Sequence, residues 1–192
     1  MVLQMKNKTY NKGWIEAICG PMFSGKTEEL IRRLKRAIIA RNKVVVFKPK
    51  IDTRYSDDLI VSHNNNTIKS ISIINEKDIL KESLNADIIG IDEIQFFKKS
   101  LINICVELAN NNKRVIVSGL DKDYTGKAFG IMPYLLCESE IITKLNAICN
   151  ICGDNAFFTN RIIKDKKQIL LGELDKYEAN CRKCFNNNKK NP

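Results

Sequence analysis

The chain has 192 residues and a formal net charge of +10 at pH 7. Hydrophobic residues make up 44% of it, which is enough for a folded core and excludes a fully disordered protein. No apolar run approaches the roughly 20 residues of a membrane-spanning helix, and residues 1–12 are polar and lack the apolar segment of a signal peptide. We therefore expect a cytoplasmic protein without a membrane partner. Its positive charge favours anionic partners such as nucleotides, nucleic acid or acidic lipid.

The first strand-like run, Trp14–Ile18, leads into the glycine-rich stretch Gly20–Thr27, which reads Gly-Pro-Met-Phe-Ser-Gly-Lys-Thr. A helical pattern over Lys26–Arg41 follows at once. This order is typical of a phosphate-binding loop, in which backbone N–H groups and the helix N-terminus face phosphate oxygens. Lys26 would then reach the β- and γ-phosphates, and Thr27 would ligate magnesium. The alternative is an ordinary glycine turn that caps a helix.

Strand-like and helix-like patterns alternate over the first three-quarters of the chain. Further strands are expected at Val44–Phe47, Ile68–Ile74, Asp87–Ile91 and Arg114–Ser118. Further helices are expected at Glu76–Leu84, Ser100–Asn111 and Met132–Glu138. Nearly continuous apolar runs indicate strands that are covered on both faces. We therefore predict an α/β fold, namely a doubly wound, mainly parallel sheet of the RecA-like phosphate-loop type.

One of these apolar strands ends in two carboxylates, Asp92 and Glu93. A phosphate-loop protein needs such a pair, and we expect it on the strand next to the one that carries the loop. The first acid would hold the magnesium shell, and the second, Glu93, is the candidate general base for phosphoryl transfer to an alcohol. Alone, an acid pair could also mark only a turn. The single histidine, His63, is interpreted as a loop residue, which makes a histidine-based mechanism improbable.

The seven cysteines fall into two groups. Three lie in apolar surroundings and are interpreted as small core residues: Cys19, Cys105 and Cys137. The other four form two Cys-x-x-Cys pairs: Cys149, Cys152, Cys181 and Cys184. In a cytosolic chain this pattern predicts one structural zinc site closed by four thiolates, with reduced, unligated cysteines as the alternative.

A domain boundary is expected near Asn146, where the last apolar stretch meets the first cysteine pair. Residues 1–146 would form the nucleotide-binding α/β domain, and residues 147–192 a zinc-binding domain. The second segment is too short to hold a core unaided, so a structural metal would supply the missing stability.

Taken together, the motifs resemble those of the type II, or cellular-type, thymidine kinases. They occur in family order from Trp14 to Cys184: Gly20–Thr27, Asp52–Tyr55, Asp92–Phe97, Gly119–Tyr124 with Phe129–Gly130, and the cysteine pairs flanking Lys176 and Tyr177. The phosphate-loop sequence and the segment Asp-Glu-Ile-Gln-Phe-Phe are specific to this family. The resemblance implies Mg-ATP-dependent phosphorylation of the 5′-hydroxyl of thymidine, or deoxyuridine, in nucleoside salvage.

The resemblance also implies roles for individual residues. Catalysis would use Glu93 as general base, with Lys26 and Arg54. Magnesium would be held by Thr27 and Asp92. The nucleotide would contact Gly20, Pro21, Met22, Phe23, Ser24, Gly25, Lys26, Thr27, Asp92, Glu93, Ile94 and Gln95. The nucleoside, gripped in part by a lasso-like loop of the zinc domain, would contact Met22, Leu120, Tyr124, Phe129, Thr159, Gln168, Ile169, Leu170, Leu171, Gly172 and Tyr177.

The family further implies a homotetramer, possible feedback inhibition by thymidine triphosphate, and no nucleic-acid partner. The main alternative is a phosphate-loop ATPase whose zinc module binds nucleic acid. The sequence of the zinc segment argues against this alternative, because the segment lacks the interleaved aromatic and arginine residues of a surface that binds single-stranded nucleic acid. A third hypothesis is a binding or regulatory relative of these kinases that has lost catalysis. The chain retains the residues that catalysis would need, which argues against it: Lys26, Thr27, Asp92 and Glu93.

Overall fold

The computed structural model describes residues 12–51, 58–62, 66–163 and 175–190. Within them, the central sheet has six parallel strands in the order β5-β2-β6-β7-β1-β8. Their bounds are β1 Trp14–Cys19, β2 Val44–Pro49, β5 Ile71–Ile73, β6 Ile88–Ile91, β7 Arg114–Gly119 and β8 Ile141–Lys144. The predicted parallel sheet is confirmed.

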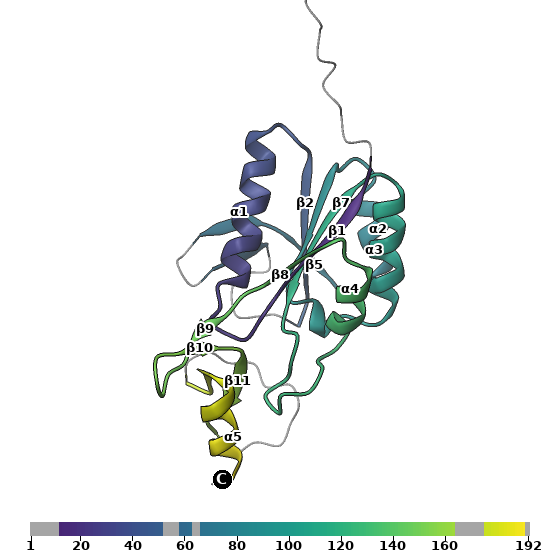
Figure 1. Cartoon of the computed structure of the whole chain (residues 1–192). Coiled ribbons are helices and arrows are strands. Elements are labelled where there is room, and N and C mark those ends of the chain that lie inside the picture. The colour runs from purple at the N-terminus through teal and green to yellow at the C-terminus, as the bar shows by residue number, and fades with distance from the viewer. Residues whose placement is uncertain (1–11, 52–57, 63–65, 164–174, 191–192) are drawn as a thin grey trace, which may run out of the picture.

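Helices cover both faces of this sheet (Figure 1). Helix α1, Lys26–Ile39, lies on one face, and the other face carries α2 Lys77–Glu82, α3 Ser100–Asn110 and α4 Met132–Glu138. Each face has its own cluster of buried apolar side chains, because every central strand is covered on both sides. The doubly wound α/β architecture is therefore confirmed.

Helix α1 packs very closely on the sheet. Its buried stripe consists of Leu30, Ile31, Leu34 and Ala37, which follows the helical period of 3.6 residues. A Cβ atom at Gly90 of β6 would lie 2.7 Å from Leu34 Cδ1, so glycine at this position lets the Leu34 side chain approach the strand closely. The buried stripe holds α1, and with it the phosphate loop, on this face of the sheet.

Two predictions about local structure were wrong. The strand expected over Ile68–Ile74 is split in two: β4, Thr67–Lys69, pairs antiparallel with β3, Leu59–Val61, whereas β5 joins the central sheet. An alternating pattern predicts a strand but not its partner, which explains the error. Cys137 is exposed on α4, although Cys19 and Cys105 are buried as expected.

Beyond β8, the described residues form two short antiparallel strand pairs and a final helix (Figure 1). The pairs are β9 Ala147–Ile148 with β10 Asn155–Ala156, and β11 Phe158–Arg161 with β12 Tyr177–Asn180. Helix α5, Arg182–Lys190, follows. The division into domains at Asn146 stays a prediction. In the part of the chain that the structure describes, no helix is long and apolar enough to cross a bilayer.

Candidate active site and metal centre

The phosphate loop joins the end of β1 to the start of α1. Gly20 has a φ of 146° and Gly25 a φ of 80°, both in the region that favours glycine. At Gly20 a side chain would also collide, because its Cβ would lie 2.4 Å from the Leu145 carbonyl oxygen. These two residues let the backbone curl at both ends of the loop, as a cradle for phosphate requires.

Two side chains of the loop turn back onto its own backbone. Lys26 Nζ donates to the Pro21 carbonyl oxygen at 2.7 Å, and Ser24 Oγ donates to the same oxygen at 2.8 Å. The Lys26 ammonium therefore lies over the loop rather than extending into solvent. Its position at the N-terminus of α1 adds a positive charge to the positive end of the helix dipole.

The acid pair reaches the phosphate loop from the end of β6. Thr27 Oγ1 donates to Asp92 Oδ2 at 3.1 Å, and Asp92 is buried. The expectation that this strand lies next to the loop strand was wrong, because β7 separates β6 from β1. The contact forms nonetheless, since parallel strands bring their carboxyl ends to the same edge of the sheet.

Glu93 follows directly and is held by its neighbours. Its backbone has a φ of 52°, in the left-handed region, and its N–H donates to Asp92 Oδ1 at 3.0 Å. Gln95 Nε2 donates to Glu93 Oε2 at 2.5 Å. The backbone of Glu93 is thus bonded to Asp92, and its carboxylate is oriented by Gln95.

Of the residues expected to contact a nucleoside, Thr159 contacts the phosphate loop, whereas Phe129 and Leu120 contact the segment that follows the acid pair. The backbone N–H of Met22 donates to Thr159 Oγ1 at 2.9 Å, which joins the loop to β11. Phe129 is buried with its ring edge-on to Phe96 at 6.1 Å between centroids. The Leu120 N–H donates to the Gln95 side chain at 3.0 Å.

Tyr124 and Tyr177 are brought together by Arg161, which sequence reasoning missed. The Arg161 guanidinium lies 3.7 Å from the Tyr124 ring centroid and donates to the Tyr177 hydroxyl at 2.8 Å. Arg161 and Tyr177 are register partners in the β11–β12 strand pair. Their pairing was not visible in the sequence, because no local pattern fixes the register of two such short strands.

Some predicted site residues lie outside the described residues. These are Arg54 and the loop residues Gln168, Ile169, Leu170, Leu171 and Gly172. His63 lies outside them as well.

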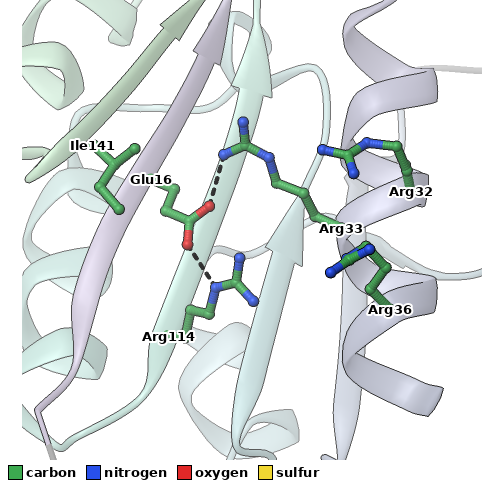
Figure 2. Close-up of a pocket in the computed structure, with 6 residues that line it drawn as sticks. All are labelled: Glu16, Arg32, Arg33, Arg36, Arg114 and Ile141. Atoms are coloured by element: carbon green, nitrogen blue, oxygen red, sulfur yellow. Dashed lines mark hydrogen bonds and ion pairs between the residues drawn. The ribbon is translucent and has the colours of Figure 1, made fainter. Parts of the chain in front are cut away.

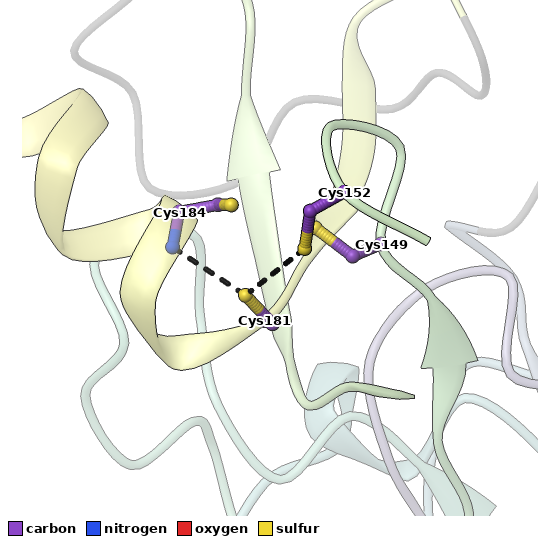
Figure 3. A group of neighbouring side chains, drawn as sticks. All are labelled: Cys149, Cys152, Cys181 and Cys184. Atoms are coloured by element: carbon purple, nitrogen blue, oxygen red, sulfur yellow. Dashed lines mark hydrogen bonds between the residues drawn. The ribbon is translucent and has the colours of Figure 1, made fainter. Parts of the chain in front are cut away.

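The four predicted zinc ligands gather at one point (Figure 3). Their sulfur atoms all lie within 4.8 Å of one another, and the Sγ atoms of Cys152 and Cys181 are 3.7 Å apart. A tetrahedral zinc ion with Zn–S bonds of about 2.3 Å separates its sulfurs by ~3.8 Å. The cluster Cys149, Cys152, Cys181 and Cys184 therefore fits a structural zinc ion.

The thiols of this cluster differ in acidity. Burial alone would raise the pKa of Cys149, but backbone N–H donors from Cys181, Cys152 and Ile151 lower it to about 6. Burial and the neighbouring thiols raise the pKa of Cys184 to about 12. Four adjacent thiolates repel one another, so full deprotonation at neutral pH calls for a bound cation.

The cysteine cluster also packs against the phosphate loop. A small apolar core of Ala147, Ala156, Ala179 and the buried cysteines includes Phe23 of the loop as a partly buried neighbour. Phe23 adopts a left-handed φ of 64°, as only a restrained backbone does for a bulky residue. The cysteine cluster and its small core therefore pack against the phosphate loop of the candidate active site through Phe23.

A second feature is a pocket of about 520 Å³ at the α1 face of the sheet (Figure 2). It is lined by Glu16, Arg32, Arg33, Arg36, Arg114 and Ile141. The buried Glu16 carboxylate forms ion pairs with Arg33 at 2.7 Å and Arg114 at 2.6 Å. Burial would raise the pKa of Glu16, but these arginines and Trp14 together lower it. The pocket shares no residue with the predicted active site.

The fold and the site together define a phosphate-loop nucleotide-binding protein. Its glycine-rich loop opens a helix at the carboxyl end of a parallel sheet, with an acid pair at the same edge. This is the arrangement that binds nucleoside triphosphates and Mg²⁺ in such proteins.

Comparison with known proteins identifies the family. The family model "Thymidine kinase" matches residues 13–185. Thymidine kinase of Bacteroides thetaiotaomicron is 52% identical over 178 residues, 93% of this chain and 89% of that protein. Thymidine kinase of Rhodothermus sp. is 50% identical over 173 residues, 90% of this chain and 81% of that protein. This chain belongs to the thymidine kinase family and is therefore a nucleoside kinase.

Among solved structures, domain III of the Thermotoga maritima replication initiation protein DnaA aligns over 73% of this chain and 58% of that chain. The TM-score is 0.44 and the sequence identity 14%, which is too slight a likeness to support an argument.

Proposed function

We propose that this chain transfers the γ-phosphoryl group of Mg-ATP to the 5′-hydroxyl of thymidine or deoxyuridine. The observation that carries the proposal is the 3.1 Å contact between Thr27 Oγ1 and Asp92 Oδ2. It brings a phosphate loop and an acid pair to one edge of the sheet, where the reaction needs a triphosphate and a proton acceptor side by side.

The loop and the acid pair would hold the donor. Lys26 would exchange its bond to the Pro21 carbonyl for phosphate oxygens, while the loop N–H groups and the α1 N-terminus bind the chain of phosphates. Thr27 and Asp92 supply the oxygen ligands that Mg²⁺ prefers. When bound, Mg²⁺ supplies charge neutralisation on the phosphates.

Glu93 would take the proton of the acceptor hydroxyl. A general base must lie within hydrogen-bond reach of that proton and keep a fixed orientation. Glu93 is partly exposed at the sheet edge and its carboxylate is held by Gln95. Of the two adjacent acids, Asp92 is the more buried and contacts Thr27, so the division of roles follows from their surroundings.

The nucleoside would bind between the phosphate loop and the metal-supported strand pairs. Met22 and Thr159 join these two parts, and Leu120, Phe129, Tyr124 and Tyr177 come from segments on either side. Aromatic side chains provide flat apolar surface for a pyrimidine ring. The family resemblance adds two further roles to the proposal: Arg54 in catalysis and residues 168–172 in nucleoside contact. These residues lie outside the described residues.

The remaining assignments rest on the resemblance alone. We propose that the enzyme acts in the cytoplasm as a homotetramer, without a nucleic-acid partner, and that thymidine triphosphate inhibits it by feedback.

The test is a nucleoside panel with purified protein, ATP and Mg²⁺, followed by ADP release and by detection of the nucleoside monophosphate. We expect ADP release that depends on thymidine or deoxyuridine and is absent with purine nucleosides. Single-stranded DNA serves as the second arm. ADP release that requires DNA, and not a nucleoside, would replace the kinase by a nucleic-acid-dependent ATPase.

A further inference from the structure

Gln95 occupies a short 3-10 helix, Ile94–Phe96, directly after the acid pair. The residue is polar but only 4% exposed. The amide bridges two parts of the site: Nε2 donates to Glu93 Oε2 at 2.5 Å, and Oε1 accepts the Leu120 N–H at 3.0 Å. A buried amide with both ends engaged is held in a single orientation.

The chemistry of the partners allows only one assignment of the amide atoms. The Leu120 N–H can only donate, so the atom that faces it must be the amide oxygen. The amide nitrogen must then face the Glu93 carboxylate. Leu120 follows the last residue of β7, so the anchor of this bridge is the end of a central strand.

Two glycines leave room for Gln95 and close around it. A Cβ at Gly119 would lie 2.4 Å from Gln95 Oε1, and a Cβ at Gly130 would lie 2.4 Å from the Gln95 carbonyl oxygen. Gly130 also has a φ of 55°, which favours glycine. Backbone from the end of β7 and from the segment before α4 therefore contacts Gln95 directly, and leaves its side chain little freedom to move.

Glu93 needs such a restraint. Its φ of 52° is uncommon for a residue with a side chain, and a partly exposed glutamate has three rotatable bonds. We propose that Gln95 is a positioning residue, which transmits the fixed position of the β7 end to the Glu93 carboxylate and so aims it at the acceptor hydroxyl. This role is separate from nucleotide contact, and it rests on the proposed function of Glu93.

The first test compares Gln95→Met and Gln95→Asn with the wild type. Methionine keeps the approximate shape but forms neither bond, and asparagine is one methylene too short to bridge both partners. We expect kcat to fall about 10- to 100-fold in both, as for a misplaced catalytic group. KM for ATP and KM for thymidine should change by a much smaller factor than kcat, because the phosphate loop, Thr27 and Asp92 that hold the donor are unchanged and the bond to the Glu93 carboxylate acts on the chemical step. Wild-type kcat in either variant would overturn the inference.

A double-mutant cycle separates positioning from a general loss of structure. If Gln95 acts only through Glu93, Gln95→Met should lower kcat less than about twofold in a Glu93→Gln background. An equal fold-loss in both backgrounds would show a merely structural role and overturn the inference. Nucleotide affinity and the thermal midpoint, measured for all four proteins, show whether each one is folded.

The proposed function can fail separately. Wild-type protein without thymidine-dependent ADP release would remove the kinase proposal itself. Full activity of Glu93→Gln would remove Glu93 as the base, and Gln95 as its positioning residue with it. An active enzyme that needs Glu93 but tolerates Gln95→Met would remove only the inference about Gln95.

Discussion

The backbone N–H of Met22 donates a 2.9 Å hydrogen bond to the hydroxyl of Thr159. One residue belongs to the phosphate loop and the other to β11, so the bond joins segments that are far apart in the chain. Thr159 is buried and Met22 partly buried, so an N–H that loses this acceptor is only partly accessible to water, which is costly. The bond therefore ties the position of the β11–β12 strand pair to that of the loop.

Thr159→Val should loosen this junction. Valine has a similar shape but no hydroxyl, so the Met22 N–H loses its acceptor at a cost of about 1–3 kcal/mol. We expect a rise in KM for thymidine of up to roughly 5- to 140-fold, since 1.4 kcal/mol corresponds to a factor of ten, and a smaller rise for ATP. Thr159→Ser keeps the hydroxyl and is the matched control. Equal thymidine KM values in the valine and serine variants would contradict the prediction.

Cys152→Ser should release the metal. Loss of one of four thiolates opens the coordination sphere, and the small core around it depends on metal binding for stability. Because Phe23 of the phosphate loop packs against this core, weaker thymidine binding should accompany the loss of zinc. Zinc content by atomic absorption and thymidine affinity by calorimetry measure the two effects.

Cys137→Ser is the control for that experiment. Cys137 is an exposed cysteine on α4 and does not belong to the cluster. It should leave zinc content and thymidine affinity at wild-type values. Retention of zinc in Cys152→Ser would show that this thiol is not a ligand.

The part of the site that the sequence predicts well is governed by local rules. The loop glycines, Lys26 and the start of α1 follow from a contiguous motif whose geometry is set within a few residues. The four cysteines were predicted as a cluster because each pair has metal-ligand spacing. Both predictions required only short-range information.

The errors and omissions concern contacts between distant segments. The position of β7 between β1 and β6 is a property of sheet order, which no local pattern records. The same holds for the Arg161–Tyr177 contact, which depends on strand register, and for the Gln95–Leu120 bond. Buried polar contacts of this kind are invisible until the topology is known, and they orient the site.

The ion-pair cluster around Glu16 should make stability depend on pH. The pKa of Glu16 is lowered in the folded protein, and that of Glu29 is lowered to about 2, chiefly by the Arg32 hydrogen bond. A lowered pKa means that the folded state binds the proton less readily than the unfolded state. The stabilisation is therefore fully present above about pH 4.5, the ordinary pKa of a glutamate, and it is lost as the pH falls through the pKa of the folded state. Urea unfolding between pH 6 and pH 2.5 should show a falling free energy of unfolding.

Glu16→Gln should flatten this acid dependence and lower stability at pH 7. It removes the carboxylate that Arg33 and Arg114 share, at a cost of about 1–3 kcal/mol, since Arg33 keeps its ion pair with Glu29 at 2.8 Å. Arg32→Gln, at an exposed position, should change stability at pH 7 little and should reduce only the contribution of Glu29 to the acid dependence. A Glu16 variant with the wild-type pH profile would show that other groups govern acid unfolding.

Glu93→Gln should separate binding from chemistry. Glutamine fills the same space and can still accept the Gln95 hydrogen bond through its amide oxygen, but it cannot take a proton from the acceptor hydroxyl. General-base catalysis contributes typically 10²–10⁴-fold, so we expect kcat to fall by about that factor. ATP affinity should stay near the wild-type value, because Lys26, Thr27 and Asp92 are unchanged.

Turnover measured with radiolabelled thymidine, together with nucleotide affinity from fluorescence titration, tests whether Glu93 acts in chemistry or in binding. Near-normal turnover would assign the proton to another group, and parallel losses of turnover and ATP affinity would instead place Glu93 in nucleotide binding.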